Sequence, residues 1–388
     1  MSRFYSYINT AKTILSLYKG DIPFSTFLKN YFAKEKKYGS RDRRMISSLC
    51  YNYFRIGTAL SNTTIEERLL TGLFLCNDVP NEILQNEKPE WNKKINSTLP
   101  EKILIAGIDV EAIFSFTDEL SESIDINAFC ASFLIQPKLF IRLRPGKQII
   151  VKNKLIAAKI DFEEISNNCL ALANGTKLEE VAIINREAVI QDMNSQKAGE
   201  LMTAANSDAP ANVWDCCAAS GGKSIMACDI LSHINLMVSD IRQSILHNLQ
   251  KRFKEAEIKD YNSFIADLTN YKNIHKNLGD KKFDVIICDA PCSGSGTWSR
   301  TPEQLTFFNK DEITKYNNLQ RSICTNTIPF LKKGGYFLYI TCSVFKSENE
   351  DIVESIKQKL PLTLVKMELL KGYEMKADTM FAALFRFD

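Results

Sequence analysis

The chain has 388 residues, 45% of them apolar and 24% charged, with a formal net charge of +3 at pH 7. This length predicts two or three domains and excludes a single small module, and the small net charge gives no reason to expect a polyanionic partner. The eleven cysteines include no C-x-x-C pair, and the three histidines form no H-E-x-x-H motif, so we expect neither a disulfide framework nor a metal site.

Residues 1–130 predict an all-α domain, because apolar side chains recur three and four positions apart. Thr63 and Glu66 form a capping-box pattern, and the apolar residues that follow share one helical face, as expected for a core: Ile65, Leu69, Leu70, Leu73 and Phe74. Residues 34–44 carry six basic and two acidic side chains. A solvated helix end and an RNA contact both explain this basic segment.

Residues 131–200 predict a small α+β connector. Short β-rich runs at 139–146 and 181–192 are separated by Gly, Asn and Pro, the residues that favour turns.

Residues 201–388 predict a third and larger domain, in which apolar strand-like runs alternate with helix-length stretches. The predicted strands are 211–215, 235–240, 264–267, 283–291 and 335–343. The alternation predicts an α/β fold with a mostly parallel, doubly wound sheet. Ligands bind such sheets at the carboxyl ends of the strands, so the residues just beyond each strand are the candidates for a site.

The first of these strands is followed by D-C-C-A-A-S-G-G-K-S, from Asp215 to Ser224. Small residues and two glycines here let the backbone approach a ligand and point N–H groups at it. Gly222, Lys223 and Ser224 match the end of a phosphate-binding Walker A loop. That motif requires a glycine five positions before Gly222, where Cys217 stands, and this disfavours a nucleoside triphosphatase.

Two aspartates end the next two strands. Asp240 stands 18 positions after Gly222, near the offset at which a carboxylate meets ribose hydroxyls, and Asp267 ends the following strand. Carboxylates repel phosphates but accept hydrogen bonds from a ribose or an adenine amine, so the pair favours a nucleoside-type cofactor. Each aspartate alone is also explained as a helix cap or a turn residue.

Two cysteines follow the last two strands. Cys292 ends the D-A-P-C motif that begins at Asp289, and Cys342 is the centre of T-C-S. Thiols beside an aspartate suit methyl transfer to C5 of a cytosine, in which a thiolate adds to C6 while an acid protonates N3. A free thiol is only a few per cent ionised at neutral pH and needs activation, for which Lys223 is a candidate. The cysteines interpreted as packing residues are Cys76, Cys130, Cys169, Cys228 and Cys324.

At these motifs the chain resembles the RsmB-type (Fmu/Sun) RNA cytosine-5 methyltransferases, which use S-adenosylmethionine. The family's D-x-C-A-A-P-G-G-K-T motif stands here as D-C-C-A-A-S-G-G-K-S, and D-A-P-C-S, T-C-S and the pair Glu348-Asn349 are present. Residues 189–196 resemble the V-Q-D segment before the family's catalytic domain, and residues 39–55 resemble part of its NusB-like domain. The likeness implies a Rossmann-like methyltransferase domain over 201–388, preceded by an all-α NusB-like RNA-binding domain and the α+β connector.

The resemblance also implies roles for individual residues. Asp240 matches the family residue that holds the ribose, and Asp267 matches a residue that lies near the adenine. Asp289 matches the family aspartate that lies between the cofactor and the cytosine. Cys342 matches the nucleophile, and Cys292 matches the cysteine that helps to release the methylated RNA, whereas spacing alone does not rank the two thiols. The implied cofactor loop comprises Cys217, Ala218, Ala219, Ser220, Gly221, Gly222 and Lys223.

Two positions depart from the family pattern. Ser220 replaces a proline, which is expected to loosen the loop. Residues 299–301, S-R-T, stand where R-R-H occurs, so only Arg300 matches.

We therefore expect a cytoplasmic, monomeric, metal-free enzyme that uses S-adenosylmethionine to methylate C5 of a cytosine in 16S ribosomal RNA. The cytoplasmic location follows because the chain has no run of 18 apolar residues and no apolar signal region in its first 20 residues. Transfer RNA is the alternative substrate, and DNA is disfavoured by the resemblance to an RNA-binding module. A noncatalytic ribosome-assembly factor is the alternative from another functional class.

Overall fold

The computed structural model describes residues 3–206, 209–231 and 233–388, which divide into two compact units. The first unit comprises residues 1–118, 124–136 and 297–310, and the second comprises residues 119–123, 137–296 and 311–388. Each unit therefore includes one short segment that lies, in sequence, within the span of the other.

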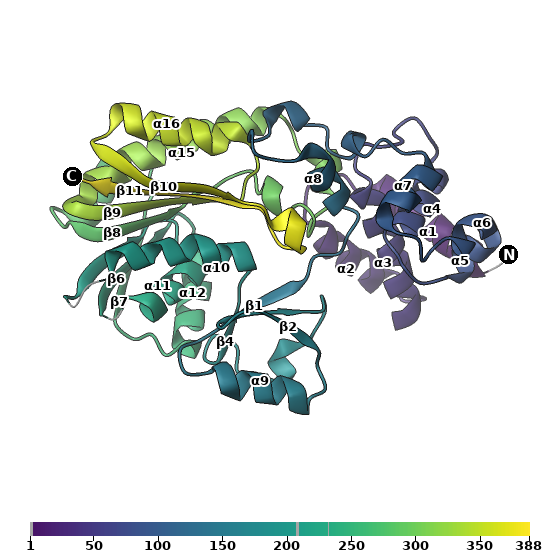
Figure 1. The fold of residues 1–388 in the computed structure, drawn as a ribbon, viewed down its shortest axis with the longest axis horizontal. Helices are drawn as coiled ribbons and strands as arrows, with labels where there is room; N and C mark the ends of the chain where they lie inside the picture. The colour runs from purple at the N-terminus through teal and green to yellow at the C-terminus, as the bar shows by residue number, and fades with distance from the viewer. Residues whose placement is uncertain (1–2, 207–208, 232) are drawn as a thin grey trace. The chain divides into compact units, whose positions relative to one another are not determined.

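The first unit is built from helices (Figure 1). Residues 297–310 belong to its core, because the ring of Phe307 lies 5.1 Å from that of Tyr18, which also packs on Phe24 at 4.9 Å. Glu303 accepts a hydrogen bond from the backbone N–H of Phe24. The helices are α1 (Arg3–Leu17), α2 (Phe24–Lys34), α3 (Ser40–Arg55), α4 (Ile65–Leu75), α5 (Glu82–Glu87), α6 (Pro89–Lys93), α7 (Leu99–Ala106), α8 (Ile126–Ser132) and α14 (Gln304–Phe307).

Helix α4 confirms the predicted apolar face but corrects the predicted cap. Leu69, Leu70, Leu73 and Phe74 are buried. The N-cap is Thr64, one residue after the predicted one, and its hydroxyl accepts from the N–H of Glu67. The hydroxyl of Thr63 instead donates to the carbonyl of Leu60 in the preceding turn.

The second unit begins with a small antiparallel sheet of strand order β2-β3-β1-β4. Its apolar residues pack beneath α9 (Gln148–Ala157), whose Val151 and Leu155 are buried. The strands are β1 (Leu139–Leu143), β2 (Phe162–Ser166), β3 (Cys169–Leu172) and β4 (Ala188–Ile190).

The second unit also contains a seven-stranded sheet of order β10-β11-β9-β8-β5-β6-β7. Strands β5 to β9 pair in parallel, and β11 runs antiparallel to both β9 and β10. The strands are β5 (Ala211–Asp215), β6 (Ile234–Asp240), β7 (Tyr261–Ile265), β8 (Phe283–Asp289), β9 (Leu331–Thr341), β10 (Leu362–Leu370) and β11 (Met380–Phe387).

Helices cover both faces of this sheet (Figure 1), because alternate residues of the buried strands point to opposite sides. Ile286 packs toward one group of helices and Ile287 toward the other. On the first face lie α13 (Tyr271–Leu278), α15 (Asp311–Thr327) and α16 (Glu350–Lys359). On the second face lie α10 (Met193–Glu200), α11 (Gly222–Ile230) and α12 (Gln243–Glu255).

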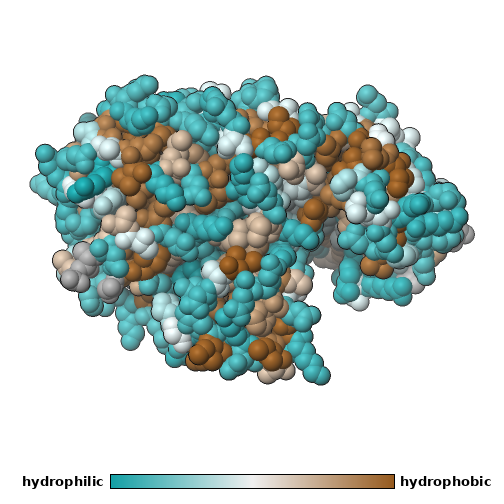
Figure 2. Space-filling view, viewed as in Figure 1, coloured by the Kyte–Doolittle hydropathy of each residue, from teal (hydrophilic) through white to brown (hydrophobic). Residues whose placement is uncertain are grey.

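This architecture confirms the predicted fold class, with helices first, then a small α+β sheet and then a Rossmann-like, mostly parallel sheet. The two C-terminal strands, β10 at the edge of the sheet and β11 beside it, were not predicted. Among the described residues, no helix has the length and apolar character needed to cross a membrane. The face shown in Figure 2 is mostly hydrophilic with hydrophobic residues in several places, among them the region of α9, where Ile149 and Ile156 are exposed.

Candidate functional site

A pocket of about 420 Å³ opens at the carboxyl ends of β5, β6 and β8. The strand order reverses at β5, whose neighbours are β6 and β8, and parallel α/β sheets bind ligands at such a reversal. The residues that line it are Cys216, Cys217, Ala219, Asp240, Ile241, Arg242, Ala266, Asp267, Leu268, Thr269, Asp289, Pro291, Cys292, Tyr316, Leu319 and Ile323.

The loop between β5 and α11 turns sharply beside this pocket. Ala219 and Gly221 have φ angles of +44° and +83°, in the left-handed region that favours glycine. A Cβ atom on Gly221 would lie 2.6 Å from the ring of Phe253, so glycine is required there for packing as well. Ser220 accepts a hydrogen bond of 2.9 Å from Arg252, a contact that the family's proline cannot make.

The two predicted cofactor aspartates both line the pocket. Asp240 is buried and accepts hydrogen bonds from the backbone N–H and the Nε of Arg242, at 2.9 and 3.2 Å. Oδ1 of Asp267 accepts from the N–H and the hydroxyl of Thr269, while no hydrogen bond from the described residues reaches its Oδ2. Carboxylate oxygens at two neighbouring strand ends therefore border the same space.

Lys223 reaches the pocket wall from the first turn of α11. Its Nζ lies 3.1 Å from Oδ2 of Asp289 and 2.6 Å from the hydroxyl of Ser195. The lysine side chain is 5% exposed and that of Asp289 is 32% exposed. The ammonium group is thus fixed behind the aspartate, and the carboxylate is the member of the pair that a ligand can reach.

Cys292 and Cys342 meet beside the pocket, with their Sγ atoms 3.3 Å apart. Both side chains are half-buried. The hydrogen bond with Cys342, together with burial, holds the pKa of the Cys292 thiol well above its ordinary value. Either thiol can donate the hydrogen bond between the two sulfurs, so one of them can keep its proton while the other reacts.

Glu348 joins the two loops that carry these thiols. It is fully buried, and its carboxylate accepts from the N–H of Ser293 at 2.9 Å and from the hydroxyl of Ser343 at 3.0 Å. Gln320 of α15 donates to the same group at 3.0 Å. Burial raises the pKa of Glu348. One carboxylate thus fixes the residue that follows Cys292 and the residue that follows Cys342.

Asn349 holds the T-C-S motif from the other side. Its Oδ1 accepts from the hydroxyl of Thr341 at 2.6 Å, and its Nδ2 donates to the carbonyl of Ser343 at 2.9 Å. The neighbours of Cys342 on both sides are therefore hydrogen-bonded to one amide side chain.

Asp215, at the end of β5, lies behind the pocket rather than in it. It is fully buried and accepts a 2.6 Å hydrogen bond from Ser224. Burial raises the pKa of Asp215 to about 7.

The structure thus brings most of the predicted site residues to one place. Cys217, Ala219, Asp240, Asp267, Asp289 and Cys292 line the pocket, and Cys342 and Lys223 contact two of them. Ala218, Ser220, Gly221 and Gly222 shape the loop and do not line the pocket. Arg242 and Tyr316 line it and were not predicted, because one is an ordinary exposed cation in sequence and the other comes from the middle of α15.

Comparison with known proteins gives a family match that includes the residues of this pocket. Residues 201–384 match the model of the family described as 16S rRNA methyltransferase RsmB/F. This part of the chain is therefore similar to the methyltransferase domain of that family. S-adenosylmethionine is the cofactor of the family.

Curated relatives carry ribosomal RNA methyltransferase names. The chain is 26% identical over 237 residues to the "Probable ribosomal RNA small subunit methyltransferase B" of Bacillus subtilis, an alignment that covers 60% of this chain and 52% of that protein. It is 30% identical over 174 residues to ribosomal RNA small subunit methyltransferase B of Serratia proteamaculans, covering 44% and 38%. The chain thus spans about half or less of the relatives that it matches.

Solved structures share the fold. The structure titled "Crystal Structure of PH0851" superposes with a TM-score of 0.70 at 17% identity, over 99% of this chain and 98% of that one. The structure of NSun6 from Pyrococcus horikoshii with SFG gives a TM-score of 0.58 at 15% identity, over 68% and 94%. The fold of the methyltransferase domain therefore has close structural counterparts.

Proposed function

We propose that the protein transfers a methyl group from S-adenosylmethionine to C5 of a cytosine in ribosomal RNA. The observation that carries this proposal is the pair of thiols, 3.3 Å apart, beside a carboxylate at the mouth of the pocket. Methylation of exocyclic nitrogen or of ribose oxygen needs no thiol, whereas C5 of cytosine becomes nucleophilic only after a nucleophile has added to C6.

The lining of the pocket fits the cofactor. Asp240 and Asp267 offer carboxylate oxygens to ribose hydroxyls and to an adenine amine, and Ile241 and Leu268 offer apolar surface to the purine ring. Among the described residues that line the pocket, Arg242 is the one Lys or Arg, and it is paired with Asp240. When bound there, S-adenosylmethionine supplies an electrophilic methyl group.

We assign the nucleophile to Cys342. Its thiolate forms a bond to C6 of the ring, and N3 takes up a proton as the C5–C6 double bond is lost. The thiol of Cys292, with its sulfur 3.3 Å away, can stabilise this thiolate by hydrogen bonding. The choice of Cys342 rather than Cys292 for the attack follows the resemblance of T-C-S to the family's nucleophile motif.

Asp289 is positioned to donate a proton to N3 of the cytosine and to take it back later. Its carboxyl group faces the pocket and is held in place by Lys223, whose Nζ lies 3.1 Å from Oδ2, so the carboxyl group is positioned for proton transfer with N3. After methylation the C5 proton passes to solvent, N3 returns its proton to Asp289, and the C6–S bond breaks as the C5–C6 double bond re-forms, so that the thiolate of Cys342 is regenerated. We assign assistance in this release to Cys292.

The first unit is proposed to contact the RNA. The basic segment 34–44 spans the end of α2 and the start of α3, and its six cationic side chains are exposed: Lys34, Lys36, Lys37, Arg41, Arg43 and Arg44. Exposed Lys and Arg groups neutralise phosphates without reading sequence. A ribosomal RNA substrate would place the enzyme in the cytoplasm.

The test is a methyl-transfer assay with labelled S-adenosylmethionine. We expect the purified protein to label 16S ribosomal RNA from a strain that lacks it, and digestion of the product to yield labelled 5-methylcytosine. If only transfer RNA is labelled, the substrate is transfer RNA and not ribosomal RNA. No label in any RNA, with intact binding to ribosomal particles, would favour a noncatalytic assembly factor.

A further inference from the structure

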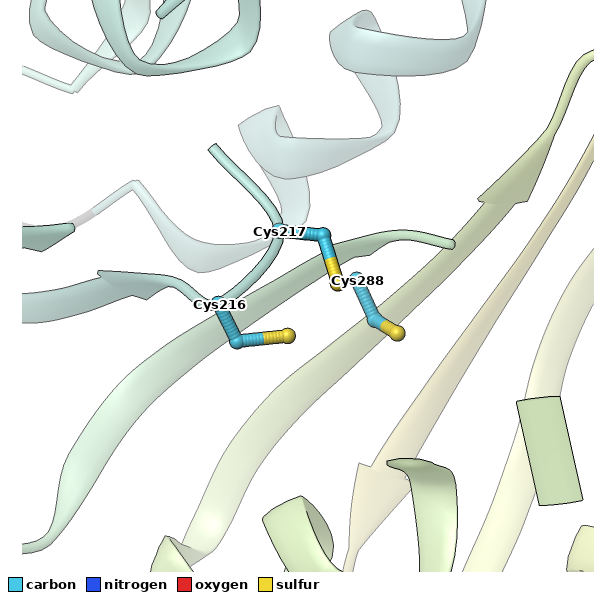
Figure 3. A group of neighbouring side chains, drawn as sticks. All are labelled: Cys216, Cys217 and Cys288. Carbon is cyan, nitrogen blue, oxygen red and sulfur yellow. The ribbon is translucent and has the colours of Figure 1, made fainter. Parts of the chain in front are cut away.

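A second group of thiols lies beneath the pocket, apart from Cys292 and Cys342. The sulfur atoms of Cys216, Cys217 and Cys288 all lie within 4.8 Å of one another. Figure 3 shows the sulfurs of Cys216 and Cys217, on the loop after β5, pointing toward Cys288 on β8. Among the described residues, this is the one group of three or more Cys, His, Asp or Glu side chains with this spacing.

The surroundings of this thiol group are apolar. Cys216 and Cys288 are completely buried and belong to the same core cluster as Trp214 and Ile323. All three cysteines are free thiols. No step of the proposed methyl transfer uses the sulfur of Cys216 or Cys288, so these two thiols have no role in that chemistry.

The group is nevertheless reachable from solvent. Cys216 and Cys217 line the pocket, and Cys217 is half-buried. A small ion entering the pocket therefore meets the sulfur of Cys217 first, whereas Cys216 and Cys288 are fully buried. Each end of the group is flanked in sequence by a carboxylate, Asp215 before Cys216 and Asp289 after Cys288, and both favour a cation over an anion nearby.

We propose that Cys216, Cys217 and Cys288 form a three-thiolate binding site for a soft d¹⁰ cation, Zn²⁺ or Cu⁺, at the floor of the pocket. Thiolates are the ligands that such cations prefer. With a metal–sulfur distance of about 2.3 Å, three sulfurs around one ion lie about 4 Å apart. Closing the present spacing to that value requires side-chain movements of less than about 1 Å.

Binding is an exchange of protons for metal. Three S–H bonds break and three metal–sulfur bonds form, with three protons released to solvent and no change of oxidation state. With three protein ligands, Zn²⁺ keeps a fourth position for water or another ligand. The proposal does not depend on the methyl-transfer activity, because a binding measurement alone decides it.

The experiment is a titration of the reduced, metal-free full-length protein with Cd²⁺, which reports thiolate ligation through its ultraviolet charge-transfer band. We expect one equivalent of Cd²⁺ to bind with release of protons, and Zn²⁺ or Cu⁺, but not Mg²⁺, to displace it. Cys216→Ser and Cys288→Ser should each weaken binding by more than about tenfold, the loss that even outer-shell changes cause at metal sites.

The matched control is the double variant Cys292→Ser/Cys342→Ser, because that thiol pair could also bind Cd²⁺. Retention of the band in this double variant supports the proposal, and loss of the band there, with retention in Cys216→Ser, overturns it. If the serine variants do not fold, alkylation of the wild type decides the question. Protection of Cys217 by one equivalent of Cd²⁺ supports the site, and unchanged labelling of Cys217 overturns it.

Discussion

The two groups of cysteines lie near the same edge of one sheet, yet their surroundings differ in kind. Cys292 and Cys342 stand on loops whose neighbouring residues are tied by hydrogen bonds to Glu348 and Asn349. The thiol group of Cys216, Cys217 and Cys288 is instead set among the apolar residues of the sheet core.

This difference bears on what each group can do. A polar framework that is fully hydrogen-bonded fixes the position of a reacting atom and tolerates the charge that develops on it. An apolar surrounding keeps thiols neutral and inert until a cation replaces their protons. We therefore interpret the first pair as catalytic and the second group as ligands.

The largest effect is expected from removal of the nucleophile. Cys342→Ala should lower the rate of methyl transfer by roughly 10³-fold or more, because the C6 adduct cannot form. The measurement is incorporation of labelled methyl into ribosomal RNA under single-turnover conditions. Cys169→Ser, a buried thiol in the small sheet, is the matched control and should keep the wild-type rate.

A smaller effect is expected from the carboxylate that joins the two thiol loops. Glu348→Gln replaces an acceptor of three hydrogen bonds by a group that donates at one end, so both loops should shift. We expect kcat to fall by roughly 10- to 100-fold while the KM for S-adenosylmethionine stays unchanged. Glu350→Gln, which alters a contact with Ser121, is the control. An equal loss in both variants would show that Glu348 only supports the fold.

The same carboxylate predicts a pH dependence of stability. Burial raises the pKa of Glu348 above its value in the unfolded chain, so between the two values the folded state binds more protons than the unfolded state. The free energy of unfolding should therefore decrease as the pH rises from about 4 through the raised pKa. Denaturant unfolding at several pH values should show a smaller decrease for Glu348→Gln, and an equal decrease would contradict the burial effect.

The smallest expected effect is a difference in stability between two serine variants, one in the apolar surroundings and one in the polar surroundings. In metal-free protein, Cys288→Ser should lower the free energy of unfolding by about 1–2 kcal/mol more than Cys342→Ser, because a buried hydroxyl at position 288 meets only thiols, which are weak hydrogen-bond partners. Chemical denaturation of the two variants measures the difference. Equal losses of stability would mean that a hydroxyl group is accommodated equally well at positions 288 and 342, which would contradict the difference between their surroundings.

Much of the catalytic half could be predicted because its strands are continuous apolar runs. Such runs identify β5, β6 and β8, and they place Asp240 and Asp289 at strand ends without any knowledge of the tertiary structure. Strands β10 and β11 escaped prediction for a physical reason. β10 is largely exposed and gives no apolar run, and the short apolar run of β11 fits a buried helix as well as a strand when judged by periodicity alone.

Contacts between distant residues could not be predicted. The meeting of Cys292 with Cys342 depends on the pairing of β8 with β9, and the meeting of Cys216 with Cys288 depends on the pairing of β5 with β8. Sequence motifs for metal sites detect only ligands that are close together in the sequence. The membership of Phe307 in the first unit is likewise a tertiary fact that no local pattern indicates.

The most direct test of the account is the search for a covalent protein–RNA complex in the two active-site variants. We predict that Cys292→Ala, incubated with S-adenosylmethionine and unmethylated ribosomal RNA, accumulates an adduct that survives a denaturing gel, because Cys342 attacks but release is impaired. Cys342→Ala should form none. An adduct from Cys342→Ala together with none from Cys292→Ala would contradict the assignment of the nucleophile.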